Sequence, residues 1–102
     1  MLIRNAGTKR EGGGFSDAEV WAVWQKGTVV PGYDGNQIRK DRCGAWMRWA
    51  EYGMTTDAGW EIDHDVPVAK GGSDALYNLQ PLYWRNNRHK GDSYPQWSCL
   101  VP

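Results

Sequence analysis

The spacing of apolar residues changes along the chain, and each change predicts a different element. Ser16 and Glu19 form a capping box, in which each side chain satisfies a backbone N–H of the other residue. The apolar residues after them recur at helical spacing, so the pattern predicts a helix that ends near Gly27. The aromatic run over residues 45–49 predicts a strand, with Arg48 on one face.

The second half of the chain predicts two extended segments, an irregular loop and a helix. Residues 60–63 form a strand that returns from the first one, after a connection rich in turn residues. Residues 65–77 cannot be regular, because a proline and paired glycines interrupt them. Residues 78–82 form a short extended piece, and residues 84–90 carry helix formers with Gly91 as a C-terminal stop.

This order of elements predicts a small α+β fold rather than a helical bundle. Residues 1–15 are polar and glycine-rich, and we expect them to be a flexible arm ahead of one domain over residues 16–102. Residues 37–43 are predicted to be a loop or a short turn of helix. Residues 92–102 are expected to form a tail that Trp97 holds onto the body.

Tryptophan is unusually frequent, with seven residues against one phenylalanine. A chain of 102 residues buries only a modest core, so we expect the large indole rings to supply much of it. The predicted core tryptophans are Trp21, Trp24, Trp46 and Trp60. Stacking on nucleic-acid bases is the alternative for such rings, and it stays open for Trp84 and Trp97.

The charge of the chain neither requires nor excludes a nucleic-acid partner. Twelve basic and twelve acidic residues give a formal net charge of zero, whereas a DNA-binding domain is usually basic. The basic residues nevertheless cluster, so local positive patches are compatible with the sequence. One cluster is Arg39, Lys40, Arg42 and Arg48, and the other is Arg85, Arg88 and Lys90.

The two cysteines and the lack of long apolar runs bear on the compartment. Cys43 and Cys99 form no CxxC motif and follow no secretory signal. This favours a reduced protein of the cytoplasm, although a disulfide between the two is also compatible with the sequence. No apolar run approaches the ~18 residues that span a bilayer, so we expect no membrane association.

The residues that can carry chemistry gather between positions 59 and 92. Asp63 and His64 are adjacent, Asn78 follows fourteen residues after the histidine, and Asn87 follows nine residues after that. Asp and Asn oxygens suit a hard cation of the Mg²⁺ type, and a neutral imidazole is the usual general base. Because neighbouring strand residues point to opposite sides, Asp63 can hold a metal ion while His64 addresses water. This set suits hydrolysis of a phosphodiester.

The segment around these residues resembles the HNH endonuclease family, whose ββα-metal site combines a hairpin, a loop and a helix. The H-N-N pattern of the family corresponds to His64, Asn78 and Asn87, with Asp63 before the histidine. The resemblance centres on residues 59–92 and covers roughly residues 20–92. Residues 39–45, 52–53 and 59–61 look like a common bacterial and phage subgroup. The resemblance implies a metal-dependent DNA endonuclease that nicks one strand per site and is encoded by a bacterium or a phage.

By this resemblance, Asp63 and Asn87 would bind one Mg²⁺ or Mn²⁺ ion, His64 would activate water, and Asn78 would orient the loop of His64. The CxxC zinc knuckles of many relatives are absent, so tryptophan packing is expected to replace them. The partner would be DNA, or alternatively RNA, and the residues do not distinguish a monomer from a homodimer. The basic residues expected to contact phosphate are Lys90, Arg88, Arg85, Arg39, Lys40 and Arg42.

Other interpretations stay open on the sequence alone. A nucleic-acid-binding module whose catalysis has decayed would keep much of the same surface. A structural zinc protein could use Cys43, His64, His89 and Cys99, although their spacing matches no compact zinc module. His64 could also be an ordinary surface histidine, and Asn78 a turn residue. A solvated face is the alternative for Arg39, Lys40 and Arg42.

Overall fold

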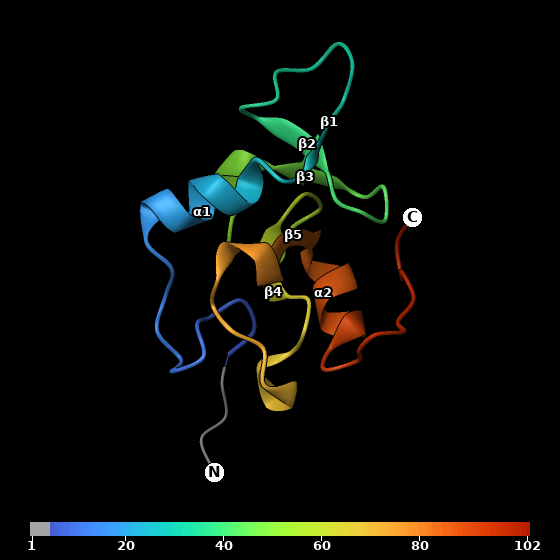
Figure 1. The fold of residues 1–102 in the computed structure, drawn as a ribbon. Coiled ribbons are helices and arrows are strands. Elements are labelled where there is room, and N and C mark those ends of the chain that lie inside the picture. The colour runs from blue at the N-terminus through green and yellow to red at the C-terminus, as the bar shows by residue number, and fades with distance from the viewer. Residues whose placement is uncertain (1–4) are drawn as a thin grey trace.

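The computed structural model describes residues 5–102, and their architecture is α+β, which confirms the predicted fold class (Figure 1). Helix α1 (Asp17–Trp24) precedes a sheet of β1 (Thr28–Val29), β2 (Ile38–Lys40) and β3 (Trp46–Arg48). A second sheet pairs β4 (Trp60–His64) with β5 (Leu79–Tyr83), and helix α2 (Trp84–Lys90) follows β5 directly. No helix among residues 5–102 has the length and apolar character needed to cross a membrane.

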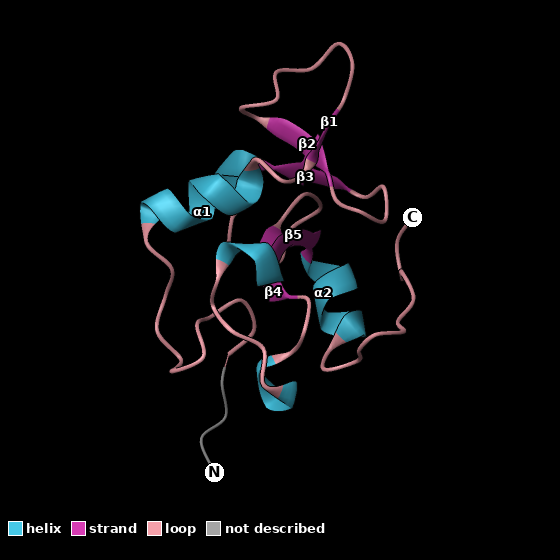
Figure 2. Ribbon diagram, in the orientation of Figure 1, coloured by secondary structure: helices cyan, strands magenta, loops and turns pink. Residues whose placement is uncertain are grey.

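The pairing of strands differs from the predicted pairing. β4 does not return along β3 but runs antiparallel to β5, from Trp60 opposite Tyr83 to His64 opposite Leu79. The segment predicted as a loop or helical turn contains β2, which lies between β1 and β3 (Figure 2). Hydrogen bonds on both edges stabilise this strand, which is too short for its own sequence pattern to reveal it.

Helix α1 fixes the N-terminal side of the core, as its sequence predicts. The Ser16 hydroxyl accepts the N–H of Glu19 at 3.2 Å, and the Glu19 carboxylate accepts the N–H of Ser16 at 2.8 Å. These two bonds confirm the capping box. One side of the helix buries Val20, Val23 and Trp24 in the core.

Three of the four predicted core tryptophans pack together. Trp24 and Trp60 are fully buried with ring centroids 5.1 Å apart, and Trp21 packs against the same cluster. Trp46 is 43% exposed, because it lies on the outward side of β3 and packs edge-on against Tyr33. The core prediction is therefore wrong for Trp46.

The N-terminal segment lies against the rest of the protein. Residues 1–4 of the predicted arm lie outside the described residues, and residues 5–15 pass beside the loop that follows β4 (Figure 1). The backbone N–H of Arg10 donates to the Asp74 carboxylate of that loop at 3.1 Å. Gly7 has φ 75°, and an added Cβ would lie 3.4 Å from the Cβ of Glu61. The positive φ favours glycine at position 7.

The C-terminal tail is fastened by a disulfide more than by Trp97. Cys43 and Cys99 are bonded to each other across a sequence separation of 56, with Cα atoms 5.8 Å apart. Trp97 is half-buried, and its ring lies 5.4 Å from the Arg42 guanidinium and 5.8 Å from the Lys90 ammonium. The two thiols are therefore paired, and the predicted contact of Trp97 supplements a covalent link.

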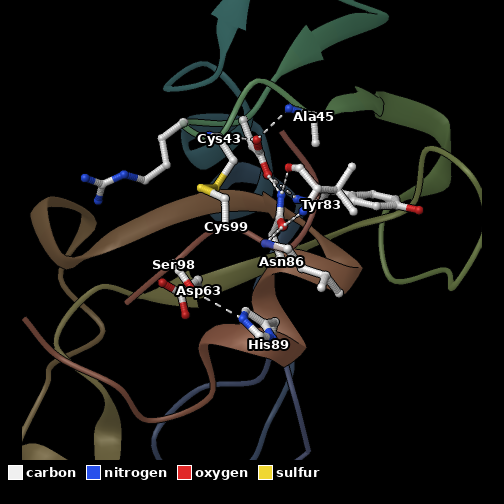
Figure 3. The surroundings of a disulfide bond; sticks show 12 residues. Cys43, Ala45, Asp63, Tyr83, Asn86, His89, Ser98 and Cys99 are labelled. Carbon is white, nitrogen blue, oxygen red and sulfur yellow. Dashed lines mark hydrogen bonds between the residues drawn. A yellow bond between two sulfur atoms is a disulfide. The ribbon is translucent and has the colours of Figure 1, made fainter. Parts of the chain in front are cut away.

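Figure 3 shows Asn86 near the disulfide of Cys43 and Cys99. The buried side chains of Asp41 and Asn86, with the backbone of Leu100 and Val101, form a cluster that we call the Asp41 corner. The Asp41 carboxylate accepts three backbone N–H groups and the Asn86 amide, all at 2.9–3.0 Å. Asn86 also donates to the carbonyl oxygen of Val101 and accepts the N–H groups of Leu100 and Val101. This corner and the disulfide, as well as tryptophan packing, hold together a domain without CxxC knuckles.

Candidate functional site

β4 ends in Asp63 and His64, whose side chains leave the strand on opposite sides. Asp63 faces α2, where the Lys90 ammonium lies 3.2 Å from one carboxylate oxygen and 3.3 Å from the other. The side-chain amide of Gln80 on β5 donates to the same carboxylate at 2.8 Å. The predicted metal ligand is thus buried between a cation and an amide donor.

Burial dominates the protonation of Asp63. Removal from water raises the pKa of this carboxyl above its ordinary value, and the hydrogen bond from Gln80 and the charge of Lys90 oppose that rise only in part. A second positive charge beside the carboxylate would favour its charged form. Burial therefore disfavours the charged form of Asp63 although Lys90 lies beside it.

His64 is buried next to the loop that follows β4. It is 3% exposed, so the alternative of an ordinary surface histidine is wrong. Its Nε2 lies 2.8 Å from Oδ1 of Asp74, and its ring centroid lies 6.1 Å from that of Phe15. Within residues 5–102, no group hydrogen-bonds to Nδ1, and no buried side-chain nitrogen lacks a partner. Nδ1 is therefore the ring nitrogen that reaches solvent.

Asn78 ties together the irregular loop between β4 and β5. Its side-chain oxygen accepts the N–H of Val66 at 2.9 Å, and its amide donates to the carbonyl oxygens of Val66 at 3.1 Å and Ser73 at 2.9 Å. Gly72 lets the chain close here, because an added Cβ would lie 1.7 Å from the Val66 carbonyl oxygen. Asn78 thus joins the start of the loop to the residue before Asp74.

Asn87 turns its amide nitrogen toward Glu61, and this fixes the direction of its oxygen. Nδ2 of Asn87 donates to Oε1 of Glu61 at 2.8 Å. The Arg88 guanidinium binds both oxygens of the same carboxylate, at 3.0 and 2.6 Å. Because only the amide nitrogen can donate to a carboxylate, Oδ1 of Asn87 points away from Glu61. Among the described residues, none donates a hydrogen bond to that oxygen.

One pocket of about 210 Å³ brings Asp63, His64 and Asn87 together, and the N-terminal segment forms part of its wall. The Asp63 carboxylate and the Asn87 amide oxygen are hard ligands of the kind that Mg²⁺ and Mn²⁺ prefer, and two protein ligands leave positions for water and phosphate. Residues 5–102 contain no group of three His, Cys, Asp or Glu side chains placed to hold a metal ion. The donor set therefore fits a hard divalent ion only if the amide oxygen takes part.

Two of the basic residues predicted to contact phosphate are engaged inside the protein. Lys90 is 1% exposed, and besides Asp63 it donates to the carbonyl oxygens of His64 and Asp65. Arg39 donates to three backbone carbonyl oxygens. A phosphate contact by Lys90 does not fit this geometry, because its ammonium is buried on Asp63, and Arg39 is likewise occupied.

The other basic candidates reach the surface to different degrees. Arg42 has 57% of its side chain exposed, and Arg85 lies on the exposed side of α2 over the Trp84 ring. Lys40 lies 5.1 Å above the ring of Trp46. Arg88 is 49% exposed although Glu61 holds its guanidinium. All four side chains keep part of their surface exposed, although Arg42 also lies 3.8 Å from the Asp65 carboxylate.

The sequence interpretation missed several residues that shape the site. Glu61 lies two positions before Asp63 and therefore on the same side of β4, so strand alternation could have indicated it. Gln80 and Asp74 gave no such signal, because their contacts arise only when β5 pairs with β4 and the loop closes. The partners of Asn86 likewise come from segments distant in the sequence.

The structure excludes a zinc site made of the two cysteines and two histidines. Cys43 and Cys99 are bonded to each other and offer no thiolate. His64 is directed at Asp74, and the exposed His89 lies 3.3 Å from the Ser98 hydroxyl. The four side chains therefore do not share a centre.

A family model described as HNH endonuclease matches residues 42–93, just over half of the chain. The matched range contains β4, the loop, β5 and α2, and with them all four residues of the Asp-His-Asn-Asn set. No curated protein and no solved structure matches the chain. The family model and the ββα arrangement agree on the same residues, and the chain belongs to the HNH endonuclease family.

Proposed function

We propose that this protein is a metal-dependent DNA endonuclease that hydrolyses one phosphodiester per site and so nicks one strand. In this proposal His64 is the general base, Asp63 and Asn87 hold one Mg²⁺ or Mn²⁺ ion, and Asn78 positions the loop beside the base. The observation that carries it is that Asp63 and His64 from β4 and Asn87 from α2 line one pocket.

The geometry supports a simple division of labour in the hydrolysis. As the water oxygen bonds to phosphorus and the bond to the leaving sugar oxygen breaks, Nδ1 of His64 accepts the proton of that water. A bound divalent ion supplies stabilisation of the negative charge that develops on the leaving oxygen. Asp63, His64 and Asn87 line the same pocket, which supports a base and two ligands acting on one phosphate.

Exposed basic side chains supply the proposed contacts to DNA, although the net charge of the whole chain is zero. Arg88 borders the pocket, and Arg85 lies one turn earlier on the same helix. Arg42 and Lys40 lie beyond, near the turn after β2. Each phosphate that a cation neutralises adds to the salt dependence of binding, so a small set predicts a shallow salt slope.

Conversion of supercoiled plasmid to nicked circle tests this proposal. With Mg²⁺ or Mn²⁺ the wild-type protein should nick the plasmid, and chelation should stop it. His64→Ala should lower the rate by about 100-fold or more, because a general base contributes that much. His89→Ala, an exposed neighbour on α2, is the matched control and should stay within about twofold of wild type. RNA of the same sequence, run in parallel, decides between the two nucleic acids. Full activity of His64→Ala would contradict the assignment.

A nucleic-acid-binding module without turnover is the second candidate, and Lys90 is the observation that favours it. Its ammonium lies 3.2 Å from Asp63, so a cation already neutralises the proposed metal ligand. A module of this kind would bind DNA with ordinary salt dependence but would yield no nicks with either ion. Calorimetric titration with Mn²⁺ separates the two candidates. The enzyme should bind Mn²⁺, and Asp63→Ala should abolish that binding, whereas the binding module requires no metal ion.

A further inference from the structure

We infer that Asp74 is a positioning residue for His64, and that residues 5–15 belong to the active site because they hold Asp74 in place. This inference rests on the proposed role of His64 as the base. Neither Asp74 nor the N-terminal segment belongs to the Asp-His-Asn-Asn set, and residues 5–15 lie outside the range that the family model matches.

The contact between Asp74 and His64 determines which ring nitrogen is free. Oδ1 of Asp74 lies 2.8 Å from Nε2 of His64. A carboxylate accepts hydrogen bonds and donates none, so in the neutral ring the hydrogen lies on Nε2. Nδ1 is then bare, and it is also the nitrogen that reaches solvent beside the pocket. Asp74 thus selects the tautomer in which Nδ1 can accept a proton from water.

Asp74 needs support, because it lies in a loop and its side chain is 28% exposed. The backbone N–H of Arg10 supplies that support, at 3.1 Å from Oδ1 and 3.4 Å from Oδ2. The donor is presented by a turn in which the N–H of Gly12 bonds to the carbonyl oxygen of Lys9 at 2.8 Å. A backbone group held in a closed turn keeps the carboxylate directed at His64.

The same segment touches the site at two further places. Its Ala6 and Gly7 line the pocket that contains Asp63 and Asn87. Phe15 lies at its end, with a ring 6.1 Å from that of His64. Lys9 pairs with Glu19 of α1 at 3.1 Å, which links the segment to the helix. Residues 5–15 therefore form a wall of the site and support its base.

Two substitutions of Asp74 test the positioning role. Asp74→Ala removes the acceptor and should lower kcat for plasmid nicking by about 10- to 100-fold, with KM for DNA within about twofold. In Asp74→Asn the Arg10 N–H should keep the amide oxygen at the position of Oδ1, facing Nε2, so this variant should recover most of the loss. In ¹⁵N NMR spectra of the metal-free protein, His64 should change from one dominant Nε2–H tautomer to a mixture in Asp74→Ala and remain largely Nε2–H in Asp74→Asn.

A substitution at Arg10 tests the segment without touching Asp74 or His64. Arg10→Pro removes the backbone donor and suits the second position of the Lys9–Gly12 turn, so the turn itself should persist. Arg10→Ala removes the same side chain but keeps the N–H, and it is the reference. We expect kcat to be at least about fivefold lower in Arg10→Pro than in Arg10→Ala, with the same change of tautomer.

The outcomes separate this inference from the proposed function. If His64→Ala is inactive while Asp74→Ala keeps wild-type kcat and a wild-type tautomer, the role of Asp74 is overturned and the nuclease proposal stands. If wild-type protein does not cleave, the NMR spectra still decide whether Asp74 and Arg10 control the ring. Equal kcat and equal spectra for Arg10→Pro and Arg10→Ala would remove residues 5–15 from the site.

Discussion

Asn86 and Asn87 are neighbours on α2, yet they serve two different regions. Asn86 is fully buried in the Asp41 corner, where its amide makes two donor and two acceptor contacts. Asn87 lines the pocket of Asp63 and His64 and makes one contact, to Glu61, so among the described residues its oxygen has no hydrogen-bond donor. A side chain with every hydrogen-bonding position filled can only stabilise, whereas one with an open acceptor can still bind a ligand.

The two buried aspartates repeat the same contrast. Asp41 is surrounded by four neutral N–H donors, so its charge is dispersed over fixed dipoles. Asp63 faces a lysine and one amide, and burial raises its pKa. A carboxylate whose charge is still poorly satisfied gains from a further cation. The two carboxylates therefore differ in their partners: neutral dipoles surround Asp41 in the scaffold, whereas Asp63 in the candidate site is paired with a charged side chain.

The strongest test of this separation is to remove the disulfide at the Asp41 corner. Its sequence separation of 56 predicts a loss of about 4 kcal/mol of folding free energy for the double variant Cys43→Ala, Cys99→Ala on the chain-entropy account. Urea denaturation measures the loss, with wild-type protein in the same buffer as reference. Under conditions where the variant is folded, nicking per molecule should stay within about twofold. Loss of Mn²⁺ binding in the folded variant would show that the two regions are not separate.

Substitution of the two asparagines should change the free energy of unfolding by different amounts. Asn86→Ala leaves the Asp41 carboxylate and the tail backbone with lost partners, so it should lower the free energy of unfolding by about 3 kcal/mol. Asn87→Ala loses one hydrogen bond beside a pocket, so its cost should stay near 1 kcal/mol. Both values come from the same urea titrations. Similar losses in the two variants would contradict the contrast between filled and open side chains.

The sequence predicted those parts whose signals are local. The capping box predicted the start of α1, and the helix formers before Gly91 predicted α2. The spacing of Asp63, His64, Asn78 and Asn87 identified the residues of one pocket and its loop, because their residue types suit a single reaction. These features depend on neighbours within a few turns or on chemistry that the residue types themselves carry.

The parts that the sequence did not predict depend on contacts between distant segments. β2 forms because β1 and β3 pair with its two edges, and β4 pairs with β5 rather than with β3. Lys90 was expected at a phosphate, but its place on α2 is set against β4, so its ammonium lies on Asp63. Local sequence patterns predict that a lysine lies on the surface, and its burial here depends on tertiary packing.

A smaller effect than the loss in Asn86→Ala separates the two asparagines most directly, because it concerns the ligand itself. An ion that binds only the folded state stabilises it by about 1.4 kcal/mol when its concentration is ten times the dissociation constant. Wild-type protein should gain this increment on addition of Mg²⁺, measured as the difference between urea titrations with Mg²⁺ and with EDTA.

Asn86→Ala should keep the increment although its baseline stability is lower, since its amide lies in the Asp41 corner. Asn87→Ala should lose most of it although its baseline is nearly unchanged, since Asn87 lines the pocket and no described residue donates to its Oδ1. Equal increments in the two variants would place the ion elsewhere, and a gain in neither wild type nor variant would favour the binding module in which Lys90 is the permanent cation of Asp63.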